Sequence, residues 1–233
     1  MSKTDIGIIV ALDMELENIE KEMTGVEIHE TAGMKFVHGE LAGKTIVAAR
    51  CGVGKVFAAV CAQTMILKFE PAIMINAGIA GALDKDLTIG EIVIAKNAVQ
   101  HDMDTTPLGD ERGLISGIDL VYLPTDEKVT AVLEQAVKSL GIKHKVGTIA
   151  TGDEFVNTTE KKKFLVEQFG ASACEMEGAS VVHTCYINKV PCSIMRAMSD
   201  GGDDNSHMDY MTFAKMAADT SAKVIVEFVK MWK

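Results

Sequence analysis

Stretches of consecutive apolar residues alternate along the chain with segments in which apolar residues recur every three or four positions. The short apolar runs are typical of buried strands, and the three-to-four spacing is typical of amphipathic helices. The pattern predicts strands at 5–12, 36–41, 44–51, 72–78, 90–100, 145–151 and 191–198. It predicts helices at 13–23, 56–69, 126–141, 159–170, 177–189 and 209–232. The segment 101–119 is polar, carries glycine and proline, and has no clear period.

This alternation of strands and helices indicates an α/β fold. We expect a central, mixed but mostly parallel, twisted sheet with helices on both faces. The strands 36–41 and 44–51 are separated only by Ala42 and Gly43, so they are expected to form a hairpin. No internal repeat, low-complexity segment or linker interrupts the sequence. We therefore expect a single domain over residues 1–233.

Composition and charge argue against several classes of partner. The chain is 48% hydrophobic and 24% charged, and no apolar run reaches the roughly 20 residues of a membrane span. A net charge of −10 argues against a nucleic-acid partner. The lysine cluster at 161–163 is expected on a solvated helix face. The apolar stretch near the N-terminus is too short for a secretory signal, so we expect a cytoplasmic protein with no membrane partner.

The spacing of cysteines and histidines gives no disulfide or metal signature. The five cysteines form no C-x-x-C pair, and their odd number fits reduced thiols. The six histidines show no H-x-x-x-H spacing. The dipeptide His101–Asp102 is expected in a loop or at an interface rather than at a metal. We expect no metal and no cofactor.

Acidic and glycine-rich segments follow the predicted strands. In sheets of this kind, ligands bind outside the carboxyl ends of the strands. Taken singly, Glu177 could stabilise a helix N-terminus and Asp200 could cap a turn. Together with Glu15 and Glu175 they favour a ligand site, because like charges that converge in a cleft are costly unless they are used. The segments are LDMEL, CGVGK, AGIAGAL, TGDEFVN, EMEGAS and MSDGGDD.

Two glycine-rich segments resemble phosphate-binding loops only in part. CGVGK has one residue between its glycines, where the P-loop pattern needs four, and it lacks Ser or Thr after the lysine. AGIAGAL lacks the G-x-G-x-x-G spacing of a dinucleotide fingerprint. Close packing of the backbone and a binding loop remain equally good readings of AGIAGAL.

Six segments have an order and spacing that resemble those of a known family: GIIVALDMEL, CGVGKVFAA, INAGIAGAL, TGDEFVN, EMEGAS and RAMSDGGDDNSH. This family is that of the 5′-methylthioadenosine/S-adenosylhomocysteine nucleosidases, within the purine nucleoside phosphorylase superfamily. The similarity covers nearly the whole chain. It implies a three-layer α/β/α, nucleoside-phosphorylase-like fold, a homodimer and no metal. It also implies hydrolysis of the N-glycosidic bond of 5′-methylthioadenosine, S-adenosylhomocysteine and 5′-deoxyadenosine, which releases adenine and a 5′-substituted ribose.

The resemblance also implies roles for individual residues. Asp200, held by Ser199, is expected to protonate N7 of the leaving adenine, and Glu15 is expected to deprotonate the attacking water. This is the two-carboxylate logic of glycoside hydrolysis applied to a nucleoside. Glu177 is expected to accept hydrogen bonds from the ribose hydroxyls, while Met176 packs against the sugar.

The remaining positions carried over from the family surround the base and the 5′-substituent. Phe155 is expected to stack on adenine, and the backbone of Val156 to read the purine edge. Ala80 and Gly81 correspond to a loop beside base and ribose. Tyr210 is expected to close the pocket for the 5′-substituent from its own chain. Glu175 is expected behind this layer of residues, with Arg196 as a partner.

Two other activities compete with hydrolysis. A phosphorylase must hold phosphate beside the ribose with cationic groups. The chain has only three arginines, Arg50, Arg112 and Arg196. A carboxylate at Glu15 would also repel phosphate, whereas it would activate water. The second alternative is a catalytically idle module that binds adenosine derivatives, and the presence of both Glu15 and Asp200 counts against it.

The sequence departs from the family pattern around the substrate pocket. Ile79 stands where members often carry serine. The segment 101–119 corresponds to one that reaches across the dimer to line the 5′-substituent pocket. In it, Thr105, Leu108 and Asp110 occupy places where relatives tend to be more apolar or aromatic. The order of preference among methylthioadenosine, S-adenosylhomocysteine, 5′-deoxyadenosine and aminofutalosine is therefore left open.

Overall fold

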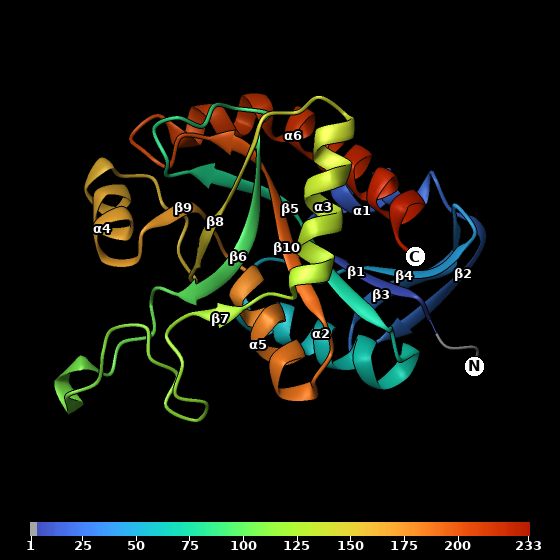
Figure 1. Cartoon of the computed structure of the whole chain (residues 1–233), viewed down its shortest axis with the longest axis horizontal. Helices are drawn as coiled ribbons and strands as arrows, with labels where there is room; N and C mark the ends of the chain where they lie inside the picture. Colours follow the sequence, from blue (N-terminus) through green and yellow to red (C-terminus); the bar gives the residue numbers. More distant parts are fainter. Residues whose placement is uncertain (1–3) are drawn as a thin grey trace.

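The computed structural model describes residues 4–233 (Figure 1). Residues 1–3 of the expected domain lie outside the described residues, and the expectation of one domain over 1–233 stays a prediction. All strands and helices predicted from the pattern are present, with shifted ends. The strands are β1 Ile6–Val10, β2 Thr24–Thr31, β3 Met34–Leu41, β4 Lys44–Arg50, β5 Ile73–Ala82, β6 Ile92–Gln100, β7 Leu123–Pro124, β8 His144–Thr151, β9 Ala171–Glu175 and β10 Cys192–Asp200. The helices are α1 Asp13–Glu20, α2 Lys55–Phe69, α3 Glu127–Ser139, α4 Thr159–Phe169, α5 Gly178–Asn188 and α6 Ser206–Met231, with a 3-10 turn η1 at Thr106–Leu108.

The strands form one mixed sheet, and part of this sheet closes on itself. The strand order is β10-β6-β8-β9-β5-β1-β4-β3-β2, and β10 also pairs with β5. The pairings of β1 with β4 and β5, of β10 with β5, and of β8 with β6 and β9 are parallel. The predicted hairpin is present as β3 and β4, which pair antiparallel from Phe36–Ala49 to Leu41–Lys44. The closed part therefore brings the ends of β5, β8, β9 and β10 together, while β2 forms the far edge.

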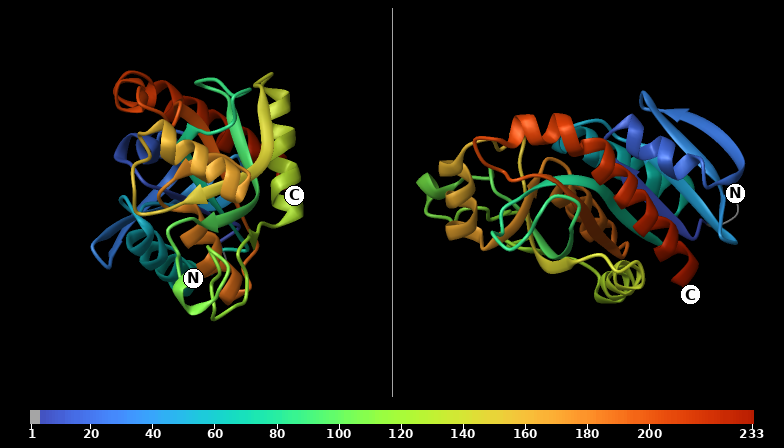
Figure 2. Two further views of the ribbon diagram at one scale, coloured as in Figure 1. Left: turned by 90° about the vertical axis from the view of Figure 1, so that its left-hand side faces the viewer. Right: turned by 90° about the horizontal axis from the view of Figure 1, so that it is seen from above.

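Helices cover both faces of this sheet, as the α/β prediction required (Figures 1 and 2). Helices α1, α3 and α6 bury Leu16, Leu133 and Phe228 against one face. Helices α2 and α5 bury Met65 and Val182 against the other. Helix α4 packs Leu165 and Phe169 on a smaller cluster beside β8 and β9. The three-layer arrangement is confirmed.

Three strands were missed by the pattern. The side chains of β2 are mostly exposed, so the strand lacks an apolar face and is held by main-chain pairing with β3. Strand β7 has two residues. Strand β9 is fully buried but consists mainly of small residues, ASACE, without the β-branched or aromatic side chains that mark a strand.

The expected loop at Ala80 and Gly81 is wrong. Strand β5 continues through both residues, because β10 and β9 lie on either side and take up their backbone groups. Ala80 pairs with Met198 and Gly81 with Asp200 on β10, and Gly81 also pairs with Cys174 on β9. No helix within residues 4–233 is long and apolar enough to cross a membrane.

Candidate active site

A cavity of about 460 Å³ opens where β1, β5, β8, β9 and β10 end. All ten residues that the sequence singled out line it, and they come from distant parts of the chain. They are Glu15, Ala80, Gly81, Phe155, Val156, Met176, Glu177, Ser199, Asp200 and Tyr210. The lining is mainly apolar, so carboxylates that face it lie in a poorly hydrated environment.

Glu15 lies in the first turn of α1 with its side chain turned back over the end of β1. It is 3% exposed. Its Oε2 accepts hydrogen bonds from the N–H groups of Ala11 and Leu12 at 2.9 Å each, and its Oε1 from the N–H of Ile79 at 3.1 Å. Burial raises the pKa of the Glu15 carboxyl, against the opposing effect of these donors and of Arg196. The side chain closes the N-terminus of α1 and lines the cavity at the same time.

Asp200 ends β10 and is 3% exposed. Its Oδ2 accepts a hydrogen bond from the Ser199 hydroxyl at 2.9 Å, and its Oδ1 accepts one from the N–H of Gly202 at 2.9 Å. The expectation that Ser199 holds Asp200 agrees with this contact. The carboxyl is thus fixed in one orientation at the cavity wall.

The glycines of AGIAGAL let β5 pass close to both carboxyl groups. A Cβ at Gly78 would lie 2.8 Å from Glu15 Oε1, and a Cβ at Gly81 would lie 2.8 Å from Asp200 Oδ1. Any side chain at either position would displace a carboxyl group. The reading of this segment as close backbone packing is therefore confirmed. Its part in binding stays a prediction, and the segment through Ala82 is a strand rather than a loop.

Glu175 and Arg196 form a buried ion pair behind the cavity. Both side chains are 2% exposed, and Arg196 Nη2 donates to Glu175 Oε2. Burial opposes the charge on Arg196, but the neighbouring Glu175 and Glu177 carboxylates raise its pKa. Asn76 accepts from the same guanidinium through its backbone oxygen at 3.1 Å and through Oδ1. Thr151 donates to Glu175 Oε1.

Glu175 also binds the start of α5, which places Glu177. Its Oε2 accepts from the N–H groups of Glu177 at 3.0 Å and Gly178 at 2.7 Å. Glu177 Oε1 in turn accepts from the N–H of Gly54 at 2.9 Å. The segment CGVGK therefore supplies a backbone donor to a carboxylate. In EMEGAS the first glutamate anchors the helix, and the second faces the cavity.

The titration of Glu177 is also altered by its place in the cavity. It is 6% exposed. Burial and the adjacent Glu175 carboxylate raise the pKa of Glu177 to about 7. Arg196 and the Gly54 N–H act in the opposite direction but do not cancel the effect. A carboxylate in this state has a spare oxygen and a strong need for hydrogen-bond donors.

The mouth of the cavity is aromatic and partly exposed. The rings of Phe155 and Tyr210 meet edge to face, with centroids 5.7 Å apart and an interplanar angle of 85°. Phe155 is 42% exposed and Met211 is 71% exposed. Burial, and then the carboxylates of Glu15, Asp200 and Glu177, raise the pKa of Tyr210. A flat, apolar ligand group fits between this mouth and the buried carboxylates.

Several lining residues were not singled out from the sequence. Val53 lies inside CGVGK and His207 ends RAMSDGGDDNSH, while Cys174 directly precedes EMEGAS and Met211 lies on α6. Their place in or beside recognised motifs was the one signal that could have found them. The segment 101–119 does not line the cavity of its own chain, and its Leu108 is 82% exposed.

The dipeptide His101–Asp102 does not form a joint site. His101 is 2% exposed, whereas Asp102 pairs with Lys55 at 2.7 Å. Burial lowers the pKa of His101, so the imidazole is neutral. Within residues 4–233, neither side chain belongs to a group with metal-ligand geometry.

Comparison with known proteins places these features in a family. The profile of the phosphorylase superfamily matches residues 5–230. The 5′-methylthioadenosine/S-adenosylhomocysteine nucleosidase of Shewanella halifaxensis is 36% identical over 227 residues, which cover 97% of this chain and 98% of the relative. The aminodeoxyfutalosine nucleosidase of Helicobacter pylori is 37% identical over 226 residues, covering 96% and 97%. Among solved structures, a mutant 5′-methylthioadenosine/S-adenosylhomocysteine nucleosidase (MTAN) of Helicobacter pylori with 5′-methylthioadenosine in its active site is 34% identical to this chain. It superposes with a TM-score of 0.95, covering 98% of this chain and 99% of that one.

Proposed function

Because the chain belongs to the phosphorylase superfamily and holds two buried carboxyl groups in one cavity, we propose that it is a purine nucleosidase. It hydrolyses the N-glycosidic bond of 5′-methylthioadenosine and S-adenosylhomocysteine, and also that of 5′-deoxyadenosine. The products are adenine and the 5′-substituted ribose. The observation that carries this proposal is that Glu15 from α1 and Asp200 from β10 both pack against β5, each beside a glycine that makes room for its carboxyl group.

Glu15 acts as the general base in this proposal. The attacking water must lose a proton as it bonds to the anomeric carbon, and a carboxylate whose pKa is raised by burial is a stronger base than an ordinary one. One water can bond to Glu15 in the cavity while the backbone N–H groups of Ala11, Leu12 and Ile79 hold the carboxylate still. The apolar surroundings exclude other water.

Asp200 acts as the general acid. Adenine leaves poorly as an anion, so a proton must reach N7 as the bond to ribose breaks, and the positive charge develops on the sugar. Ser199 and Gly202 fix the carboxyl in place. In this proposal the water activated by Glu15 attacks the face of the ribose opposite the leaving adenine.

The rest of the cavity holds the substrate. Glu177 accepts hydrogen bonds from the 2′- and 3′-hydroxyls, since a vicinal diol offers two donors and a carboxylate two acceptors. Met176 packs on the sugar, Phe155 stacks on adenine, and the backbone of Val156 reads the purine edge. Ala80 and Gly81 form a flat strand surface beside base and ribose. Proton transfers between substrate, water and these side chains complete the reaction without a cofactor.

Hydrolysis is favoured over phosphorolysis because all three arginines already pair with carboxylates. Arg50 pairs with Asp13 at 2.9 Å, Arg112 with Asp104 at 2.6 Å, and Arg196 with Glu175. Phosphate beside the ribose would have to displace one of these partners while facing Glu15 and Glu177. The test is adenine release from methylthioadenosine in phosphate-free buffer. Turnover that requires phosphate and yields a ribose 1-phosphate would contradict hydrolysis, and tight binding without turnover would indicate an idle binding module.

A second substrate is supported by the similarity to the aminodeoxyfutalosine nucleosidase. Its reaction breaks the same bond, so the two activities differ only in the group at the 5′-position. That group would lie at the exposed mouth, beside Tyr210, His207 and Met211. Side-by-side kcat/KM values for methylthioadenosine, S-adenosylhomocysteine, 5′-deoxyadenosine and aminofutalosine would rank these substrates.

The proposal includes a homodimer and a cytoplasmic location. An apolar stripe on α2 is exposed, with Val56 at 74%, Phe57 at 56% and Leu67 at 72%. Leu108 is exposed in the segment 101–119, as a residue that reaches across an interface would be. The five cysteines are all free and buried, which fits a reducing compartment. Sedimentation of a fully active monomer at assay concentration would contradict the dimer.

A further inference from the structure

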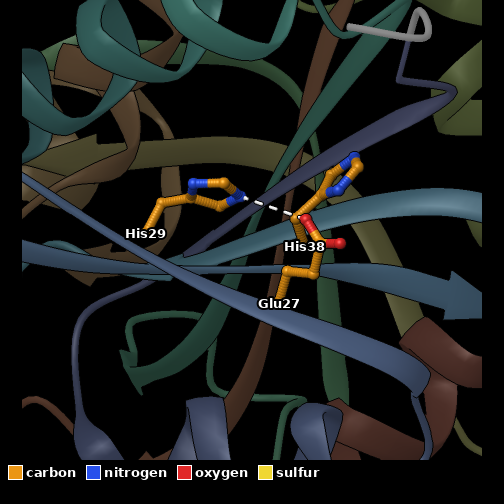
Figure 3. Close-up of side chains that lie close together, drawn as sticks. All are labelled: Glu27, His29 and His38. Carbon is orange, nitrogen blue, oxygen red and sulfur yellow. Dashed lines mark ion pairs between the residues drawn. The ribbon is translucent and has the colours of Figure 1, made fainter.

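Three potential metal ligands gather on the hairpin of β2 and β3, far in strand order from the active site. They are Glu27, His29 and His38, and their ligand atoms all lie within 4.8 Å of one another. Figure 3 shows the three side chains close together, with the His29 ring facing the Glu27 carboxylate. His29 and Glu27 approach to 3.8 Å.

The strand pairing explains why these residues meet. Glu27 lies directly opposite His38 in the antiparallel pair, and His29 lies two residues beyond Glu27. Residues two apart point to the same face of a strand, and directly opposed residues point to the same face of the sheet. The three ligands therefore share one face by construction. Their spacing along the sequence carries no such signal, since nine residues separate the two histidines.

The imidazole rings are oriented by packing rather than by hydrogen bonds. His38 stacks on Phe69 at 5.8 Å between centroids and 28° between planes, and His29 meets the same ring edge-on at 5.4 Å. Apart from the ion pair with Glu27, neither imidazole has a side-chain or backbone partner within residues 4–233. Both rings are partly buried, which leaves ring nitrogens free to bind a ligand.

We propose that Glu27, His29 and His38 bind a divalent transition metal of the zinc type. Imidazole and carboxylate ligands suit Zn²⁺, whereas Mg²⁺ and Ca²⁺ prefer sites made of oxygen alone. In a tetrahedral site with bonds of about 2.0–2.1 Å, ligand atoms lie about 3.3 Å apart. The ligand atoms must therefore close by up to about 1.5 Å, and the Glu27 side chain, which is 74% exposed, is free to move. Water fills the remaining coordination position.

The charges around the site favour a cation on balance. Glu40, two residues after His38 on the same strand, lines the same surface hollow with its carboxylate. Lys68 opposes this, but its ammonium group donates to Thr31 and lies over the outer part of the Phe69 ring at 5.7 Å. Two carboxylates therefore face one lysine. A metal here would add a side-chain link between the edge strand β2 and β3 to their main-chain pairing.

The proposed site is tested by metal binding to the chelator-treated enzyme. Calorimetry with ZnCl₂ should give one Zn²⁺ per chain, and MgCl₂ should give none. Loss of groups that merely orient metal ligands typically costs 10–100-fold in affinity. His29→Ala and His38→Ala should therefore each weaken Zn²⁺ binding by at least about 100-fold. Zinc at 100 times its dissociation constant should raise Tm by about 5–10 °C in the wild type and in neither variant.

A matched control is His144→Ala. His144 lies 3.3 Å from Glu134 on another part of the surface, so it offers a histidine and a carboxylate without a third ligand. This variant should bind Zn²⁺ at the hairpin as the wild type does. Circular dichroism in metal-free buffer checks that the hairpin variants fold. No saturable Zn²⁺ binding, or binding equally strong in the His29→Ala/His38→Ala double variant, overturns the proposal.

Discussion

The floor and the mouth of the active-site cavity are built in different ways. The floor, formed by Asn76, Glu175 and Arg196, is at most 8% exposed and its charges are paired. The mouth, formed by Phe155, Tyr210 and Met211, is partly exposed, and the rings of Phe155 and Tyr210 meet edge to face. Because Glu175 of the floor binds the start of α5, we expect the floor to affect both chemistry and stability. We expect changes at the mouth to have little effect on either and to alter which 5′-substituent is accepted.

The largest expected effect comes from breaking the floor. Glu175→Gln leaves the Arg196 charge buried without its partner, which typically destabilises a protein by about 3–5 kcal/mol. Urea unfolding should show this loss. The control is Glu167→Gln, which breaks an exposed pair with Lys163 on α4 and should cost less than about 1 kcal/mol. Equal stability of the two variants would contradict a structural role for the floor.

The next effect separates chemistry from binding. Asp200→Asn should remove protonation of N7, and Glu15→Gln should remove activation of water. Each should lower kcat by at least about 100-fold, the usual scale for a lost acid or base. Glu154→Gln is the control, because Glu154 lines the cavity yet pairs with Lys161 outside it at 2.6 Å. A kcat near the wild-type value in either of the first two variants would remove that residue from the mechanism.

The difference between the floor and the mouth of the cavity could be predicted from the sequence only in part. Glu15, Glu177 and Asp200 could be found because an acid after a strand end leaves a local signal in the sequence. The family resemblance supplied their roles. The pairing of Glu175 with Arg196 could be expected only loosely, because 21 residues separate them and the contact depends on β9.

Features that depend on strand pairing could not be predicted from the sequence. Strand β9 and the continuation of β5 through Gly81 arise because neighbouring strands take up backbone groups, which no single segment encodes. The cluster of Glu27, His29 and His38 was missed for the same reason, since only the register of β2 on β3 brings it together. Local patterns therefore predict elements and their exposed ends, but not the contacts between strands.

Glu177 lies between the floor and the mouth. Its substitution tests how the ribose hydroxyls are recognised. If it accepts from both ribose hydroxyls, a 2′-deoxy substrate leaves one carboxylate oxygen without its partner. A hydrogen bond to a charged group contributes about 1.5–3 kcal/mol, so kcat/KM should fall by roughly 10–100-fold. In Glu177→Gln much of this discrimination should already be lost. Both substrates must be measured on both proteins, with a correction for the faster intrinsic loss of bases from deoxynucleosides. Unchanged discrimination in the variant would leave Glu177 as a helix-capping acid.

The pH dependence should also depend on Glu177. Its folded pKa of about 7 lies above the ordinary value of 4.5, so the carboxylate forms only as pH rises through about 7. We expect kcat/KM to fall about tenfold per pH unit below that point. Because the pKa of Glu177 is higher in the folded than in the unfolded state, its ionisation lowers the unfolding free energy of the free enzyme as pH rises from 4.5 through 7. Glu177→Gln removes this titration, so kcat/KM of the variant should no longer fall tenfold per pH unit below about 7. A limb that stays in place would assign it to another group.

The smallest effect should come from the mouth. Tyr210→Phe keeps the ring that meets Phe155, and the tyrosine hydroxyl has no hydrogen-bond partner within residues 4–233. Its kcat/KM for methylthioadenosine should therefore stay within about threefold of the wild type. Tyr210→Ala removes an aromatic pair that contributes about 0.5–1.5 kcal/mol, so its unfolding free energy in urea should fall by no more than about that amount. Its loss in kcat/KM, expected to stay below about tenfold, should differ between methylthioadenosine and S-adenosylhomocysteine if the group at the 5′-position reaches this ring. A loss of 100-fold or more that is equal for both substrates would place Tyr210 with the floor, and the distinction between the two regions would fail.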